Sequence, residues 1–161
     1  MSTLRYTIYE GTFEVDSSLG YTEKSLSFSF NIPSKTTILS SKIDYSVNLT
    51  KSALQNVFVI KFNDVDVAKE EWYITGARGG SITVSPTIGT NTVKLVFGRN
   101  SGAFPFSAVW DVSVHLTIEY EGEPPTPVKP EQPLPLQILI YAIVAAIILG
   151  AVAVMVKVIR R

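Results

Sequence analysis

The segment from Ile138 to Val156 restricts the possible folds of this chain most strongly, because it is long, apolar and free of charged side chains. As an α-helix its nineteen residues would extend for roughly 28 Å, which is close to the hydrocarbon thickness of a bilayer. A helix buried in a globular core rarely runs this far without a polar residue. We therefore predict a single transmembrane helix over residues 137–158, followed by a basic tail over residues 159–161.

Three small residues share one face of this predicted helix. Ala142, Ala146 and Gly150 lie four residues apart, which is the spacing that lets two transmembrane backbones approach closely. Alanine is common in transmembrane helices, so the alternative is that these are ordinary lipid-facing residues. In either case the lipid bilayer is an expected partner of the chain.

The charges beside the helix predict its orientation. Lys157, Arg160 and Arg161 follow the helix, whereas Lys129 lies among acidic residues before it. The positive-inside rule then places the C-terminus in the cytoplasm, and Lys157 should extend its ammonium group to the membrane interface. We expect a single-pass protein of a virion membrane or a host cell membrane, with its N-terminal domain on the non-cytoplasmic side. Because the first residues lack the apolar region of a secretory signal, a tail-anchored protein with a cytoplasmic domain is the alternative.

A proline-rich segment lies directly before the predicted helix. Residues 122–136 contain six of the nine prolines of the chain, a density that disfavours a helix or a central strand and favours extended polyproline II. We predict a semi-rigid stalk that holds the preceding domain up to about 35 Å from the bilayer. An SH3-type ligand is the alternative for this segment.

Residues 1–121 show the alternation typical of β-strands and no helical stripe. In residues 110–120 apolar side chains alternate with polar ones, namely Asp111, Ser113, His115, Thr117 and Glu119. The same pattern occurs in residues 26–32 and 43–49, and further strands are expected around residues 4–9, 57–62, 72–75, 81–84 and 92–97. About eight short antiparallel strands predict a β-sandwich that is jelly-roll-like. The predicted fold is therefore all-β, an antiparallel sandwich followed by one C-terminal transmembrane α-helix.

The composition excludes several classes of function. The chain has no cysteine and one histidine, His115, which excludes disulfides, thiol nucleophiles and the usual zinc sites. Positive and negative side chains balance, and charged residues make up 17%, against about a quarter in typical domains, which argues against a nucleic-acid partner. We predict that the chain is not an enzyme and needs no cofactor or metal.

Two regions of the β domain are candidates for contacts with a partner. His115 falls on the polar side of its strand, where it is either solvated or faces another protein. Phe104 and Phe106 flank Pro105 in a predicted loop and suit a contact with a neighbouring subunit or with a ligand. At least half of the aromatic residues in this part of the domain should be core residues, with Phe97 and Trp110 on the inward side: the set is Trp72, Tyr73, Phe97, Phe104, Phe106 and Trp110.

A carboxylate-rich segment and a glycosylation sequon are two further motifs of the β domain. Residues 64–71 are rich in carboxylates but lack the glycine and the spacing of a calcium-binding loop, so we predict a charged hairpin there. Asn48-Leu49-Thr50 matches the N-glycosylation sequon, with Asn48 on the polar face of its strand.

The β domain resembles the galactose-binding-like and carbohydrate-binding-module jelly rolls. The resemblance rests on residues 57–67, 81–85 and 89–97, in which a strand ends in Asn63-Asp64 and a Gly89-Thr90-Asn91 turn enters an apolar strand. It covers less than a third of the chain, and Asp64 stands where those modules usually have glycine. The resemblance implies a sandwich fold and allows a glycan as ligand.

The layout of the whole chain is similar to that of membrane-anchored capsid proteins of icosahedral viruses with an internal bilayer, including viruses of hot-spring archaea. In that family a jelly roll packs in the shell and a terminal helix attaches the shell to the membrane. A single small domain implies a minor or vertex-associated component. We therefore hypothesise a structural protein whose partners are the bilayer and other structural proteins, through self-association or contact with a coat protein. A cell-surface module that binds glycans or mediates adhesion is the alternative.

Overall fold

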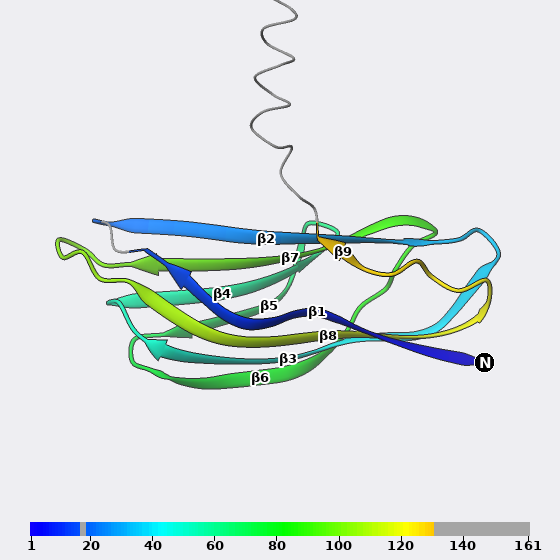
Figure 1. Ribbon diagram of the computed structural model, residues 1–161, viewed down its shortest axis with the longest axis horizontal. Helices are drawn as coiled ribbons and strands as arrows, with labels where there is room; N and C mark the ends of the chain where they lie inside the picture. Colours follow the sequence, from blue (N-terminus) through cyan, green and yellow to red (C-terminus); the bar gives the residue numbers. More distant parts are fainter. Residues whose placement is uncertain (17–18, 131–161) are drawn as a thin grey trace, which may run out of the picture. The chain divides into compact units, whose positions relative to one another are not determined.

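The computed structural model describes residues 1–16 and 19–130. The chain divides into two units, residues 1–131 and 132–161, and the described residues belong to the first. They form nine strands and are all-β (Figure 1). The strands are β1 (Ser2–Val15), β2 (Tyr21–Ile32), β3 (Thr36–Lys51), β4 (Gln55–Phe62), β5 (Val65–Trp72), β6 (Gly76–Thr83), β7 (Gly89–Asn100), β8 (Ala108–Gly122) and β9 (Lys129–Pro130).

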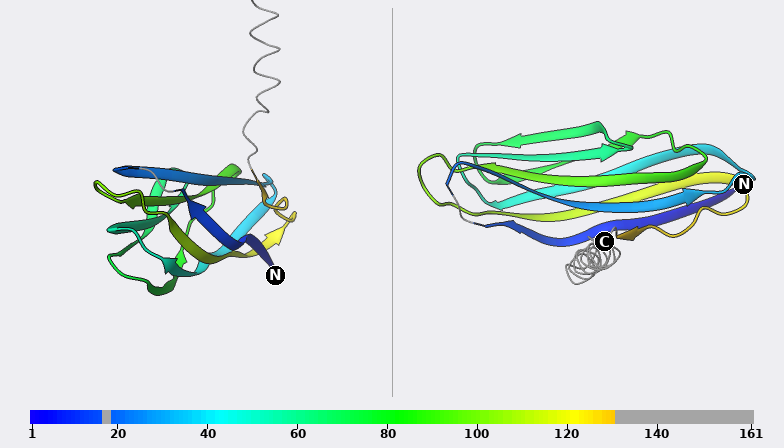
Figure 2. Two further views of the ribbon diagram at one scale, coloured as in Figure 1. Left: turned by 60° about the vertical axis from the view of Figure 1, so that its left-hand side comes forward. Right: turned by 90° about the horizontal axis from the view of Figure 1, so that it is seen from above.

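The strands form two antiparallel sheets that face each other (Figures 1 and 2). Sheet A has the order β1-β8-β3-β6, and sheet B has the order β5-β4-β7-β2-β9. Strand β1 pairs with β8, β2 with β7, β3 with β6 and β4 with β5. These are the pairs of one long hairpin, which is then rolled so that β8 also pairs with β3 and β7 with β4. The predicted antiparallel sandwich is confirmed, and this pairing is that of an eight-stranded jelly roll.

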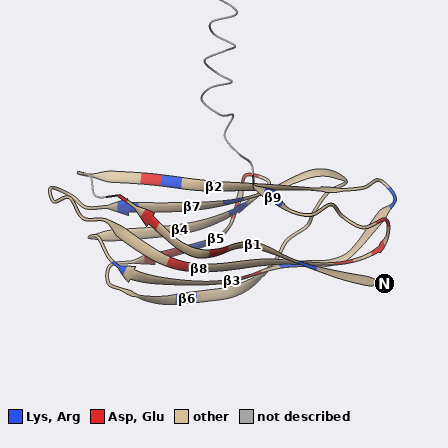
Figure 3. Ribbon diagram, in the orientation of Figure 1, with Lys and Arg blue, Asp and Glu red and all other residues tan. Residues whose placement is uncertain are grey.

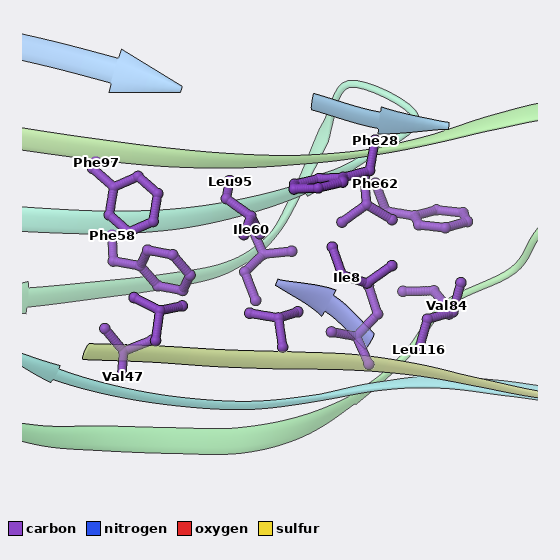
Figure 4. Packing of buried hydrophobic residues seen from close by; sticks show 14 of the residues in the cluster. Ile8, Phe28, Val47, Phe58, Ile60, Phe62, Val84, Leu95, Phe97 and Leu116 are labelled. Carbon is purple, nitrogen blue, oxygen red and sulfur yellow. The ribbon is translucent and has the colours of Figure 1, made fainter. Parts of the chain in front are cut away.

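The core lies between the two sheets, where inward apolar side chains of both sheets pack together (Figure 4). On β8 the apolar set from Trp110 to Ile118 is buried, as the alternation predicted. Phe97 stacks on Phe13 with ring centroids 4.1 Å apart and lies 5.5 Å from the ring of Trp110. Transfer of such side chains from water supplies most of the stability of a sandwich of this size.

The carboxylate-rich segment forms a hairpin, as predicted. A two-residue turn, Asn63-Asp64, joins β4 to β5, and both residues have positive φ angles of 48° and 65°. This is the geometry of a type I′ turn, which suits the right-handed twist of the flanking strands. The prediction of a strand at residues 72–75 is wrong, because β5 ends at Trp72 and the chain then turns into β6. Charged side chains on the outer face of this edge strand obscured its alternation.

The first part of the proline-rich segment contacts the sandwich, which the sequence did not predict. The Tyr6 hydroxyl donates a hydrogen bond to the carbonyl of Pro125 at 3.0 Å. Thr126 bonds to the backbone of Asn31 through both its amide and its hydroxyl, at 3.0 and 2.8 Å. Strand β9 then pairs with residues 28 and 29 of β2. We call residues 123–130 the strap; it covers part of the β2 edge of sheet B.

Residues 1–16 and 19–130 include no helix long and apolar enough to cross a bilayer.

Candidate functional site

The outer face of sheet A holds the polar residues that the sequence predicted on β8. Asp111 accepts a hydrogen bond from the hydroxyl of Thr12 at 2.8 Å, and Glu119 accepts one from Ser40 at 2.6 Å. Across from His115 lies Asp44 on β3, whose pKa is lowered by a hydrogen bond from Ser81 and by Lys42. The face is therefore a ladder of satisfied polar side chains.

His115 lies between two hydroxyl groups on this face. Its Nε2 is 3.1 Å from Oγ of Ser113, and its Nδ1 is 3.3 Å from Oγ1 of Thr7. A serine activated by histidine needs an acid behind the imidazole and donors for an oxyanion, whereas here a threonine hydroxyl stands behind the ring. The arrangement is that of a half-buried, hydrogen-bonded residue on the outer face of the sheet, and the role of His115 as a partner contact stays a prediction. Asn48 of the sequon is exposed on the same face.

Four loops lie side by side at one end of the sandwich. Each connects a strand of sheet A to the strand of sheet B that faces it: residues 52–54, 73–75 and 101–107, and the described residues 16, 19 and 20 between β1 and β2, seen at the left of Figure 1. Each contributes at least one large, exposed apolar side chain, with exposed fractions between 47% and 78%. We call this set the apolar loop end: Leu19, Leu54, Tyr73, Ile74, Phe104 and Phe106.

The loop that carries Phe104 and Phe106 is held by backbone hydrogen bonds. The amide of Phe106 donates to the carbonyl of Phe104 at 3.0 Å, and the amide of Phe104 donates to Ser101 at 3.2 Å. Both rings are exposed, at 63% and 47%, with centroids 6.1 Å apart. The structure thus places both predicted contact residues at the surface, and their role as contacts stays a prediction.

The other aromatic residues divide as expected, with half of the set in the core. Trp72, Phe97 and Trp110 are at most 2% exposed, whereas Tyr73 is 66% exposed. Trp72 is therefore not available to stack on a ligand. The sequence did not single out Leu19, Leu54 and Ile74, although each lies in a short segment without charged neighbours.

A shallow groove crosses the outer face of sheet B, and the sequence did not predict it. Its volume is about 330 Å³. Val57, Val59 and Val96 form an apolar floor, and the ring of Tyr21, 60% exposed, lies over Gly98 at one end. Amides and charged side chains surround the floor: Glu23, Gln55, Lys61, Asp66, Lys69, Glu71 and Asn100.

The charged groups of this groove are paired with one another. Lys61 lies 2.8 Å from Asp66, and Lys69 lies 2.7 Å from Glu71, which raises the pKa of both lysines. Burial and a hydrogen bond to Glu23 raise the pKa of Tyr21. Within residues 1–16 and 19–130, no group of histidine and carboxylate side chains could hold a metal ion. The groove thus offers paired charges and amides around an apolar floor, which suits an uncharged ligand with hydroxyl groups.

The predicted membrane residues lie outside the described part of the chain. These are the helix-packing residues Ala142, Ala146 and Gly150 and the interface residues Lys157, Arg160 and Arg161.

No known protein family matches the sequence, and no curated protein matches it. Among solved structures, a chain of infectious bursal disease virus, Gx strain, is 16% identical with a TM-score of 0.45; the match covers 75% of this chain and 32% of that one. The CBM36-1 domain of a multidomain xylanase from the hindgut metagenome of Trinervitermes trinervoides is 10% identical with a TM-score of 0.39, and the match covers 76% of this chain and all of that domain. Latent PorU from Porphyromonas gingivalis is 8% identical with a TM-score of 0.43, with 71% of this chain and 13% of that one covered.

A virus structure and a carbohydrate-binding module are thus both among the matches, as the two sequence resemblances predicted.

Proposed function

We propose that this chain is a membrane-anchored structural protein of a lipid-containing particle, without enzymatic activity, whose sandwich binds another protein while its C-terminal helix stays in the bilayer. The structural basis of this proposal is the exposed apolar loop end. Soluble domains rarely expose a contiguous group of large apolar side chains unless it is a contact surface. Aromatic residues, with few charges among them, are typical of the centre of a protein interface.

The charge distribution supports a protein contact at this end. Asp16 is the one charged residue in the sequences of the four loops, and its carboxylate is paired with Lys24. Figure 3 shows how the charged residues lie along the strands and at other loops. The loops at the opposite end carry Lys35, Asp64 and Glu123. Loops without lysine or arginine gain nothing from anionic lipid headgroups, which attract those side chains.

The strap supports a short connection to the membrane. Because Pro130 pairs with Phe28 on β2, six residues separate the sandwich from the predicted helix at residue 137. Six residues span at most about 20 Å. The free part of the proline-rich segment is therefore shorter than the full stalk predicted from the sequence.

The test is incorporation of full-length variants into particles from the native source. We expect deletion of residues 138–156 to prevent incorporation, and Phe104→Asp with Phe106→Asp to reduce it strongly. Ile88→Asp is the matched control, because Ile88 is 57% exposed in the loop between β6 and β7 at the opposite end. Normal incorporation of the deletion variant or of the double variant contradicts the proposal.

A second candidate function is glycan binding, and the groove on sheet B favours it. The apolar face of a sugar ring can stack on an exposed aromatic side chain such as Tyr21. Amide and carboxylate groups, such as those of Asn100 and Glu23, can bind its hydroxyl groups. The groove and the apolar loop end are separate sets of residues, so the two functions can be tested separately.

A glycan array probed with residues 1–130 tests this second function. Saturable binding that is lost in Tyr21→Ala, and reduced in Gly98→Ala, supports it, because a Cβ on Gly98 would lie 2.6 Å from the Tyr21 hydroxyl and displace the ring. Phe104→Ala is the control outside the groove. Absence of binding, or binding that survives Tyr21→Ala, rejects the groove as a glycan site.

A further inference from the structure

The apolar loop end has a stepped outline. The loop of residues 101–107 is the longest of the four and extends beyond the ends of β3 and β6 (Figures 1 and 2). It carries Phe104 and Phe106, whereas the short loops at residues 52–54 and 73–75 carry Leu54, Tyr73 and Ile74. One half of the end therefore projects, and the other half is recessed.

Hydrogen bonds and packing join neighbouring loops of this end. The amide of Gly20 donates to the carbonyl of Gly102 at 2.9 Å, and the amide of Ser101 donates to the carbonyl of Gly20 at 3.1 Å. The side chain of Leu54 reaches within 3.0 Å of the position that a Cβ on Gly102 would take. A surface fixed in this way loses little conformational entropy on binding.

The exposed surface of these six residues is comparable with the surface that one partner buries in a standard protein interface. A large side chain offers on the order of 200 Å² when fully exposed. Six side chains that are 47–78% exposed therefore present roughly 750 Å², compared with about 800 Å² per partner in a typical stable complex.

We propose that the occupant of the apolar loop end is a second copy of this chain, docked end to end about a two-fold axis. The projecting half of each copy then packs over the recessed half of the other. A surface that meets itself places like charges together, but the four loop sequences contain only the Asp16 carboxylate, which is paired with Lys24. Two-fold pairing is also the commonest closed assembly of identical chains.

The position of the strap is compatible with this pairing. Pro130 lies opposite Phe28, seven strand residues or about 23 Å from Tyr21 at the loop end. Docking through the loop end therefore leaves the strap uncovered in both copies. The inference rests on the proposed function in one respect: two copies anchored in the same bilayer have a raised effective concentration, which allows a moderate affinity to suffice.

The oligomeric state of residues 1–130 tests the inference without the membrane segment. Among the described residues, both sheets and the hydrophobic core are formed within residues 1–130, so this part can be studied by itself. In sedimentation equilibrium we expect a monomer–dimer equilibrium that Phe104→Asp and Ile74→Asp each weaken by about tenfold or more, since central interface residues have effects of this size. Ile88→Asp and Leu39→Asp are exposed controls that should leave the association unchanged.

Disulfide trapping tests the stepped arrangement directly, because the chain has no cysteine of its own. A mixture of Phe104→Cys and Ile74→Cys proteins should form a mixed disulfide dimer under mild oxidation, and Ile88→Cys should not replace Ile74→Cys in that reaction.

A monomer at all concentrations, or a dimer that Phe104→Asp and Ile74→Asp leave intact, overturns the inference. Binding of the monomer to vesicles of uncharged lipid, lost in Phe104→Asp, also overturns it and makes a lipid surface the occupant. Particle incorporation of the full-length variants is a separate measurement. A chain that does not self-associate can thus still be incorporated into particles, and a chain that dimerises can still fail to be incorporated.

Discussion

The hydroxyl of Tyr45 on β3 donates a hydrogen bond of 2.7 Å to the carboxylate of Glu70 on β5 and so connects the two sheets. The connection depends on Gly80, which lies opposite Tyr45 on β6. A Cβ at Gly80 would lie 3.2 Å from the Tyr45 ring and its hydroxyl. The missing side chain therefore leaves the space through which Tyr45 reaches the other sheet.

This contact predicts a loss of stability at alkaline pH. Burial, followed by the hydrogen bond and the charge of Glu70, raises the pKa of Tyr45 from 10.0 to about 12. The folded state thus favours the neutral hydroxyl, and its stabilising contribution is complete below pH 10 and is lost as the pH rises from 10 to 12. Urea unfolding of residues 1–130 between pH 9 and 12 should show a steeper fall of the unfolding free energy for the wild type than for Tyr45→Phe. Equal slopes for the two proteins would contradict this.

The turn between β4 and β5 predicts a stabilising substitution. Asp64 has a φ angle of 65°, a conformation that costs most residues about 1 kcal/mol and glycine much less. Asp64→Gly creates the Asn-Gly sequence preferred in type I′ turns. We expect a gain of about 0.5–1 kcal/mol in the unfolding free energy, measured by urea denaturation. A decrease would show that the Asp64 carboxylate stabilises the hairpin by more than its backbone strain costs.

The strap predicts that the stable domain extends beyond residue 121. A fragment of residues 1–122 lacks the hydrogen bonds of Pro125 and Thr126 and the packing of Val128 on the core. We expect it to be less stable than residues 1–130 by about 1–3 kcal/mol. Thr126→Val in the longer fragment should account for about 1 kcal/mol of this loss. Equal melting temperatures of the two fragments would mean that the strap contributes nothing to folding.

Core and groove aromatic residues should respond differently to truncation. Trp72 is 2% exposed, so Trp72→Ala should cost about 3–5 kcal/mol of unfolding free energy. Tyr21 is 60% exposed, and Tyr21→Ala should change stability by no more than about 0.5 kcal/mol. Chemical denaturation of both variants checks this difference. The same measurement shows which variant is folded well enough for a binding assay, because a partly unfolded protein loses binding whatever the role of the substituted residue.

Strands with one buried face could be predicted from the sequence, and edge features could not. The alternation around His115 on β8 and around Tyr45 on β3 follows directly from a buried and a solvated side. The bounds of strand β5 were predicted wrongly because it lies at a sheet edge with Lys69 and Glu71 outward and has an irregular register beside Lys61. A proline-rich composition predicted an extended segment, but it contains no signal that Thr126 would bond to a strand far away in sequence.

The candidate surfaces depend on the order of the strands, which the sequence did not supply. Phe104 and Phe106 were found because two phenylalanines in a polar loop stand out. Leu54 and Ile74 became part of the same surface only because their loops join facing strands at the same end of the sandwich. Tyr21 likewise lines the groove only because β2 pairs with β7.

Whether this chain is a membrane-anchored component of a lipid-containing particle can be measured by flotation of membranes and particles from the native source on a density gradient, with the chain followed by mass spectrometry. We expect comigration with nucleic-acid-containing particles at a fixed stoichiometry, and loss of that comigration when residues 138–156 are deleted. Comigration with ordinary cell membrane alone would contradict the claim and would favour the glycan-binding function.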